Sequence, residues 1–192
     1  MGKIIISANV TLDGVVQDPG GDEGFARGGW FGEAGESDRA EWARVQLDET
    51  LAAAALLFGR RSYEWFAARW PARTGELAER LSSMPKYVVS SALRDPGWHN
   101  STVLTGDALS EVAALKQQLT GDIVVYGSFR LGHALMAHDL VDELRLMIFP
   151  FVLGAGQRLF TETGGTRPMR LISNRGVGES LVLLTYQPVR AH

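Results

Sequence analysis

The stretch that decides the fold is Leu56-Leu57-Phe58-Gly59-Arg60-Arg61-Ser62-Tyr63-Glu64. Apolar residues that suit a buried strand end at Gly59, and two arginines and a serine follow. Gly59 allows close backbone approach, and Ser62 can cap a helix whose first N–H groups would point at a negatively charged group. The two guanidinium groups would suit a phosphate monoester. The alternative is a surface turn with two solvated arginines.

Composition restricts the class of protein. The chain has 192 residues, 45% of them hydrophobic and 21% charged, which predicts one compact domain over residues 1–192. The net charge of −3 provides no general basic field, so we expect no nucleic-acid partner. Without cysteine there is no thiolate chemistry, and the scattered histidines predict no metal site. With no signal segment or long apolar run, we expect a cytoplasmic protein without a membrane partner.

Short apolar runs rich in β-forming residues recur along the chain and predict strands at Lys3–Val10, Ala53–Phe58, Lys86–Ser90, Ile123–Tyr126, Leu144–Phe151 and Ser180–Tyr186. Helical patterns lie at Ser37–Leu51, Ser62–Ala68, Glu76–Leu81, Asp107–Leu119 and Phe129–His138. The alternation of strand and helix predicts an α/β fold with a central, mostly parallel sheet. After Asp142 no long amphipathic helix separates the strands, which predicts an antiparallel C-terminal part.

The segment at about 17–36 differs from its surroundings because it is rich in glycine and carries Phe25, Trp30 and Phe31. Glycines make a loop flexible, and aromatic residues give it a surface with which to close. We therefore expect a mobile lid that shields a site from water. The alternative is a surface insertion whose aromatic residues pack on the body of the protein.

Two further strands are followed by groups that can bind an anion. One continues into Ser90-Ser91, and the other into Gly127-Ser128 before a helix. The carboxyl ends of parallel strands lie on one edge of a sheet, where ligands of open α/β folds bind. One cradle would suit a pyrophosphate and another, with Arg60 and Arg61, a phosphate monoester. NADPH has both groups, so we expect it to be the cofactor.

The segments Ile5–Gly14, Phe58–Glu64, Val88–Ser91, Ile123–Ser128 and Asp142–Phe160 carry a resemblance to known proteins over nearly the whole chain. In them the chain resembles the dihydrofolate reductase-like superfamily, and within it the C-terminal reductase domain of the bifunctional riboflavin-biosynthesis deaminase-reductase. The resemblance implies a three-layer fold with helices on both faces of the sheet. It also implies NADPH-dependent reduction of a small heterocyclic or sugar-linked substrate, as in 5-amino-6-(ribosylamino)uracil reductase, and a homodimer.

The resemblance also implies which residues hold the cofactor. The turn of Gly59, Arg60, Arg61 and Ser62 would meet the 2′-phosphate or pyrophosphate, with Ser90 and Ser91 flanking the adenosine phosphate. The pyrophosphate would lie on Gly127, Ser128, Phe129, Arg130 and Leu131. The end of the first strand, Ala8, Asn9 and Val10, would lie against the nicotinamide, with Val16 nearby.

A hydride transfer also requires a proton, which a carboxylic acid could supply. Asp13 is the first candidate, with Asp38, Glu41 and Glu64 as alternatives, and a turn aspartate before glycine is the competing interpretation of Asp13.

Trp30, Trp65 and Phe66 are candidate stacking surfaces for a flat substrate, or else core residues. The rival function is a nucleotide-binding or sensor module without turnover.

Overall fold

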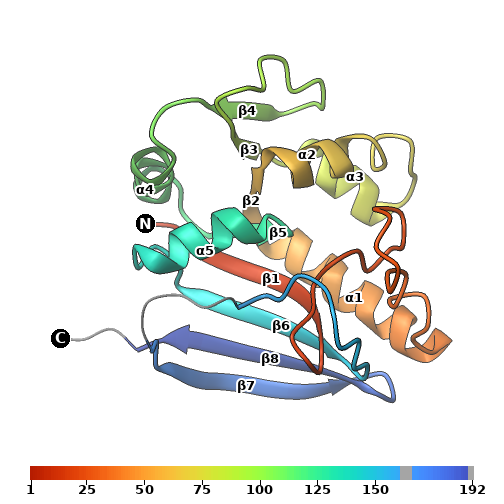
Figure 1. The fold of residues 1–192 in the computed structure, drawn as a ribbon. Helices are drawn as coiled ribbons and strands as arrows, with labels where there is room; N and C mark the ends of the chain where they lie inside the picture. Colours follow the sequence, from red (N-terminus) through yellow and green to blue (C-terminus); the bar gives the residue numbers. More distant parts are fainter. Residues whose placement is uncertain (161–165, 190–192) are drawn as a thin grey trace. The chain divides into compact units, whose positions relative to one another are not determined.

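The computed structural model describes residues 1–160 and 166–189. These residues form the eight strands and five helices drawn in Figure 1. Their bounds are β1 (Lys3–Thr11), α1 (Glu36–Ala52), β2 (Ala53–Gly59), α2 (Arg60–Ala67), α3 (Glu76–Ser83), β3 (Lys86–Val89), β4 (Ser101–Leu104), α4 (Ala108–Gln118), β5 (Asp122–Tyr126), α5 (Phe129–Ala137), β6 (Glu143–Phe149), β7 (Met169–Val177) and β8 (Leu181–Pro188). In this described part of the chain, no helix has the length and apolar character needed to cross a membrane.

The chain forms two compact units. The first unit contains Met1–Ile6 and Gln46–Asp142, and the second contains Ser7–Val45 and Glu143–His192. The strands follow the order β4-β3-β2-β5-β1-β6-β8-β7. Pairing is parallel among β4, β3, β2 and β5, and antiparallel among β6, β8 and β7. The predicted α/β fold, with a mostly parallel sheet and antiparallel C-terminal strands, is confirmed.

In the first unit, β2 lies between β3 and β5 and runs parallel to both. Leu56, Leu57 and Phe58 are 0% exposed, as expected for a strand that is buried on both faces. The same holds for the apolar run in β5, where the side chains of 123–125 are fully buried. These strands form the centre of the hydrophobic core of this unit together with Tyr63, Leu81, Met84, Val88 and Trp98.

In the second unit, β8 pairs with β6 on one side and with β7 on the other. Its core is built around Trp30, Met147, Phe149, Val177 and Leu181. β7 is exposed at nearly every position and is the last strand of the order. It is therefore an edge strand with little side-chain burial of its own.

Two strands differ from the sequence-based expectation. β4 was not predicted, because it is short and begins with the polar residues Ser101 and Thr102. β7 was not among the predicted strands either, because Leu171 and Ile172 are its only consecutive apolar residues and most of its length is polar and exposed. In both cases backbone pairing with a neighbouring strand, rather than burial of an apolar face, creates the strand.

Lys86, the first residue of β3, is a charged residue with 0% of its surface exposed. Its ammonium donates hydrogen bonds to the carbonyl oxygens of Leu81 (2.8 Å), Ser82 (3.0 Å) and Met84 (2.8 Å) at the end of α3. It also lies 4.5 Å from the ring centre of Trp98. Burial lowers the pKa of Lys86 from 10.5 to about 8, which leaves the ammonium charged at neutral pH. Lys86 thus caps the C-terminal end of α3.

We expect Lys86→Met to lower the free energy of unfolding by about 2 kcal/mol, because it keeps the apolar stem but leaves buried carbonyls without a donor. Urea denaturation at neutral pH, followed by circular dichroism, measures the change. Lys3→Met, at an exposed lysine, is the control and should have little effect. A Lys86→Met protein as stable as the wild type would show that desolvation of the ammonium cancels its hydrogen bonds.

Candidate functional site

Strand ends of the first unit meet at one edge of the parallel sheet. Gly59 at the end of β2 lies opposite Val89 at the end of β3. Leu57 lies opposite Val125, so two residues further along each strand the chain reaches Gly59 and Gly127. The segments predicted to bind anions therefore share this edge, which is where ligands of open α/β sheets bind.

Hydrogen bonds between serines and backbone join the segments that follow β2 and β5. The Gly59 N–H donates to Ser128 Oγ at 2.9 Å, and the Ser128 N–H donates to Ser62 Oγ at 2.7 Å. The prediction that Ser62 caps α2 is wrong, because the helix begins at Arg60 and its N-cap residue is Gly59. Ser62 lies in the first turn, and its hydroxyl accepts a hydrogen bond from the neighbouring segment instead.

Two helices begin at this edge without a side-chain cap. α2 follows Gly59 and α5 follows Ser128, and neither of these N-cap residues makes a side-chain hydrogen bond to its helix. The first turn of α5 holds Phe129, Arg130 and Leu131, of which Arg130 is exposed and Leu131 buried. N–H groups at the start of a helix carry partial positive charge and attract anions. The edge therefore offers two backbone positions for negatively charged groups.

Arg60 and Arg61 lie on the first turn of α2, and both side chains are exposed. Arg60 Nη1 lies 3.6 Å from Oε1 of Glu64, one turn along, with 51% and 48% of the two side chains exposed. A surface ion pair of this kind contributes little to stability, so Arg60 can contact another anion at small cost. Glu64, an alternative proton donor, shares this surface.

The two serines after β3 lie in different environments. Ser90 is buried, and its Oγ accepts hydrogen bonds from the N–H groups of Ala92 (3.2 Å) and Leu93 (2.9 Å). These bonds shape the turn that follows the strand. Ser91 is exposed, so its hydroxyl is the more available of the two for a ligand.

The predicted aromatic residues of α2 pack on one another. Phe66 stacks on Tyr126, with ring centres 6.2 Å apart and an interplanar angle of 6°, and belongs to the edge of the core. Trp65 packs edge-on against Phe66 and lies under the guanidinium of Arg69, 4.4 Å from its ring centre. The structure therefore places Phe66 in core packing and leaves Trp65 half-buried on α2.

A buried hydroxyl cluster around Tyr126, the residue before Gly127, was not predicted. The Tyr126 hydroxyl donates to Glu49 Oε2 at 2.8 Å and lies 3.1 Å from Oγ1 of Thr50, which is 0% exposed. In the sequence Tyr126 is the last residue of a buried strand, and Glu49 belongs to the polar part of a helix. The signal that could have revealed the cluster is a tyrosine directly before Gly127 and Ser128.

In the second unit, Asp13 holds a turn. Its Oδ1 accepts hydrogen bonds from Thr11 Oγ1 (2.7 Å) and Leu153 N–H (3.2 Å), and its Oδ2 accepts one from Gly154 N–H (2.7 Å). The Thr11 hydroxyl is the largest cause that lowers the pKa of Asp13 from 3.8 to about 2, with the backbone N–H groups adding to it and burial opposing it. A carboxylate that is ionised and engaged in this way is poorly suited to donate a proton.

Asp38, another candidate donor, holds the turn between β7 and β8 and is 2% exposed. Oδ1 accepts hydrogen bonds from the N–H groups of Glu179 (2.6 Å) and Ser180 (3.0 Å), and Oδ2 accepts one from Ser180 Oγ (2.7 Å). The Ser180 hydroxyl is the main cause that lowers the pKa of Asp38. Glu41 lies further along α1 and pairs with Arg44 at the surface.

The residues predicted to face a nicotinamide are packed inside the second unit. Ala8, Val10 and Val16 are buried. Asn9 Oδ1 accepts a hydrogen bond from Trp42 Nε1–H at 2.8 Å. This segment therefore offers a ligand mainly its backbone groups, and the nicotinamide contact stays a prediction.

The loop at 17–36 carries Trp30 into the core of the second unit. Trp30 is 3% exposed, packs edge-on against Phe149 at 5.2 Å between ring centres, and donates from Nε1 to the Gln17 carbonyl at 2.9 Å. Its ring is thus a core contact, as in the alternative interpretation of the aromatic residues. Motion of the loop as a lid stays a prediction.

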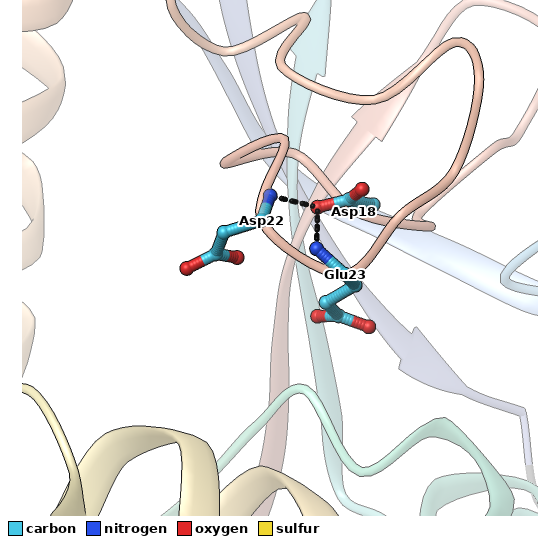
Figure 2. Close-up of side chains that lie close together, drawn as sticks. All are labelled: Asp18, Asp22 and Glu23. Carbon is cyan, nitrogen blue, oxygen red and sulfur yellow. Dashed lines mark hydrogen bonds between the residues drawn. The ribbon is translucent and has the colours of Figure 1, made fainter.

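Three acidic side chains of this loop, Asp18, Asp22 and Glu23, have oxygens within 4.8 Å of one another. Figure 2 shows Oδ1 of Asp18 accepting hydrogen bonds from the N–H groups of Asp22 and Glu23. Oδ2 of Asp18 accepts another from the N–H of Phe25 at 3.1 Å. The buried carboxylate of Asp18 is therefore engaged in shaping the loop.

Comparison with known proteins agrees with this architecture. The RibD C-terminal domain family matches residues 2–183. Over 189 residues the chain is 27% identical to the protein YyaP of Bacillus subtilis (strain 168). This match covers 96% of this chain and 94% of that protein.

Two solved structures are similar in fold. A putative riboflavin biosynthesis protein from Shewanella sp. PV-4 superposes with a TM-score of 0.76 at 20% identity, over 98% of this chain and 99% of that one. Dihydrofolate reductase from Enterococcus faecalis, solved in complex with NADP(H) and RAB-propyl, gives a TM-score of 0.61 at 14% identity, over 97% and 96% of the two chains. The fold is therefore dihydrofolate reductase-like.

The hydrogen bonds of Asp13 predict a pH dependence of stability. Because its pKa is lowered from 3.8 to about 2 in the folded protein, the stabilisation is complete above about pH 4 and is lost as the pH falls toward 2. Between pH 7 and pH 2 the free energy of unfolding should therefore fall by less in Asp13→Asn than in the wild type, by on the order of 1–2 kcal/mol. Thermal unfolding measured between pH 2 and 7 tests it, with Asp48→Asn, at an exposed aspartate, as control. Parallel pH curves for wild type and Asp13→Asn would contradict the assignment.

Proposed function

The chain belongs to the RibD C-terminal domain family, and from this premise we propose that it is an NADPH-dependent reductase acting on a small heterocyclic or sugar-linked substrate. The observation that carries the proposal is the pair of uncapped helix starts, α2 and α5, joined at one edge of the parallel sheet. Such a pair can receive two phosphate groups of one dinucleotide.

The residues at this edge fit the phosphates of NADPH. The backbone N–H groups of Phe129, Arg130 and Leu131 suit the pyrophosphate at the start of α5. The exposed guanidinium groups of Arg60 and Arg61 suit the 2′-phosphate, with Ser91 beside them. Gly59 has φ −80°, and a Cβ there would meet no atom closer than 3.8 Å, so the fold itself does not require glycine. Glycine at this position instead keeps the backbone open to a ligand.

When bound, NADPH would supply the hydride, and the chain would have to supply a proton. The engaged carboxylates of Asp13 and Asp38 favour another donor. Glu64 is exposed on the surface of the first unit beside Arg60, and it remains a candidate proton donor. The Tyr126 hydroxyl, which is hydrogen-bonded to Glu49, is a second candidate proton donor, and Tyr126 lies three residues before the first residue of α5.

A rival proposal is a nucleotide-binding or sensor module that binds the cofactor but catalyses no reaction. The specific observation in its favour is that Asp13 and Asp38 serve as hydrogen-bond acceptors for loops. Both functions require the cofactor site, so binding and turnover have to be measured separately.

We expect the protein to bind NADPH more tightly than NADH, because Arg60 and Arg61 can pair with the 2′-phosphate. The double variant Arg60→Ala/Arg61→Ala should weaken NADPH binding at least about tenfold and leave NADH binding within about twofold. Titration followed by nicotinamide fluorescence measures both. Arg175→Ala, an exposed arginine on β7, is the matched control. Equal affinity for NADPH and NADH in the wild type would overturn the phosphate assignment.

Turnover distinguishes the two functions. NADPH oxidation is followed with a panel of pterins, pyrimidine ribosides and small carbonyl compounds. A reductase should oxidise NADPH with at least one class, and the family favours the pyrimidine ribosides. Tight NADPH binding without oxidation by any member of the panel would favour the sensor module.

We further propose that the protein is a homodimer paired through β7. This strand ends the sheet order and exposes Leu171 (46%) and Ile172 (45%). Unpaired strand edges readily pair with another chain. Sedimentation should give twice the chain mass of 20.9 kDa, and Leu171→Asp/Ile172→Asp should give the single mass. Val152→Asp, at an apolar position outside the strands that is 71% exposed, is the control, and a monomeric wild type would refute the dimer.

A further inference from the structure

At the edge where β2 and β5 end, two serine hydroxyls each accept a hydrogen bond from the other serine's backbone segment. We call Gly59, Ser62, Gly127 and Ser128 the serine clasp. Ser128 Oγ accepts the Gly59 N–H at 2.9 Å, and Ser62 Oγ accepts the Ser128 N–H at 2.7 Å. Ser128 Oγ also donates to the Tyr126 carbonyl at 3.2 Å. The clasp therefore ties the start of α2 to the start of α5 across more than 60 residues of sequence.

The backbone of the clasp is adapted to this contact. Gly127 has φ +57° and Ser128 has φ +54°, so two consecutive residues are left-handed directly before α5. A Cβ at position 127 would lie 2.9 Å from Ser62 Oγ, which is closer than real contacts allow. Gly127 is thus required twice, by its backbone conformation and by the approach of the Ser62 hydroxyl. Strained backbone of this kind is common at functional sites.

The hydroxyls of the clasp are already engaged with protein groups. Ser62 accepts from one backbone N–H, and Ser128 both accepts from and donates to the backbone. Their most direct effect is therefore on the positions of the two helix starts. Those starts have backbone N–H groups that no side chain caps, and these are the groups that can contact phosphates.

We propose that Ser62 and Ser128 are positioning residues, which hold the starts of α2 and α5 at the separation needed to bind both phosphate-bearing parts of one dinucleotide. This inference rests on the proposed function. A preformed site pays less ordering entropy on binding, so the clasp raises affinity for a ligand that spans both helix starts. A ligand that reaches only one start gains nothing from the clasp.

The experiment compares NADPH with adenosine 2′-monophosphate, which carries the monoester but no pyrophosphate. Ser62→Ala and Ser128→Ala should each weaken NADPH binding about fivefold to tenfold, which corresponds to the loss of about one hydrogen bond. Binding of adenosine 2′-monophosphate should change less than about twofold. Ser62→Thr, which keeps the hydroxyl, should retain most of the NADPH affinity. Ser83→Ala is the control, because this serine is exposed and its hydroxyl donates to the Arg80 carbonyl within α3.

Each titration is made at a temperature where circular dichroism shows the variant folded, so that loss of stability does not appear as loss of affinity. Unchanged NADPH affinity in both alanine variants would overturn the inference. An equal loss for NADPH and adenosine 2′-monophosphate would overturn it too, because it would indicate direct contact or general loosening. A wild type that binds adenosine 2′-monophosphate but not NADPH, or neither, would refute the proposed function and the clasp together.

Discussion

The parallel pairing of β2 with both β3 and β5 is the constraint on which the rest of the first unit depends. Parallel strands that are buried on both faces end at a common edge, and their last backbone groups have no further strand to pair with. Ser62 and Ser128 accept two of those N–H groups, and two helices then begin. The positive polarity of the edge follows from this arrangement of backbone groups, to which the arginines add charge.

The acidic residues of the second unit follow a different principle. Asp13, Asp18 and Asp38 each accept several hydrogen bonds from backbone N–H groups of nearby turns or loops. A carboxylate can accept up to about four such bonds, which makes it an efficient organiser of loop backbone. For Asp13 and Asp38, hydrogen bonds from the hydroxyls of Thr11 and Ser180, together with these backbone bonds, lower the pKa and so oppose proton donation. The chemistry of a reductase would then depend on groups of another kind, such as Glu64 or the hydroxyl of Tyr126.

Sequence patterns predicted the buried strands well and the exposed ones poorly. The run Leu56–Phe58 is apolar at each position because both faces are covered, and this signal is strong. Neither β4 nor the second half of β7 buries an apolar face, so their residues carry no such pattern. Likewise, a serine that caps a helix and one that lies in its first turn have the same local sequence, and only the neighbouring segment distinguishes them for Ser62.

The sequence by itself determined the five helices, the buried strands of the parallel sheet, the antiparallel pairing that follows them, and the meeting of three polar strand ends at one edge. These follow from hydrophobic periodicity and from turn residues, which are local properties. Only the tertiary structure decided what each polar side chain does there. Ser62 and Ser128 turn to each other's backbones, Ser90 turns into its own loop, and Asp13 binds a turn 140 residues away. The reason is physical. The partner of a hydrogen bond depends on which segments lie close together in the folded chain, and the residue type at either position does not specify that proximity.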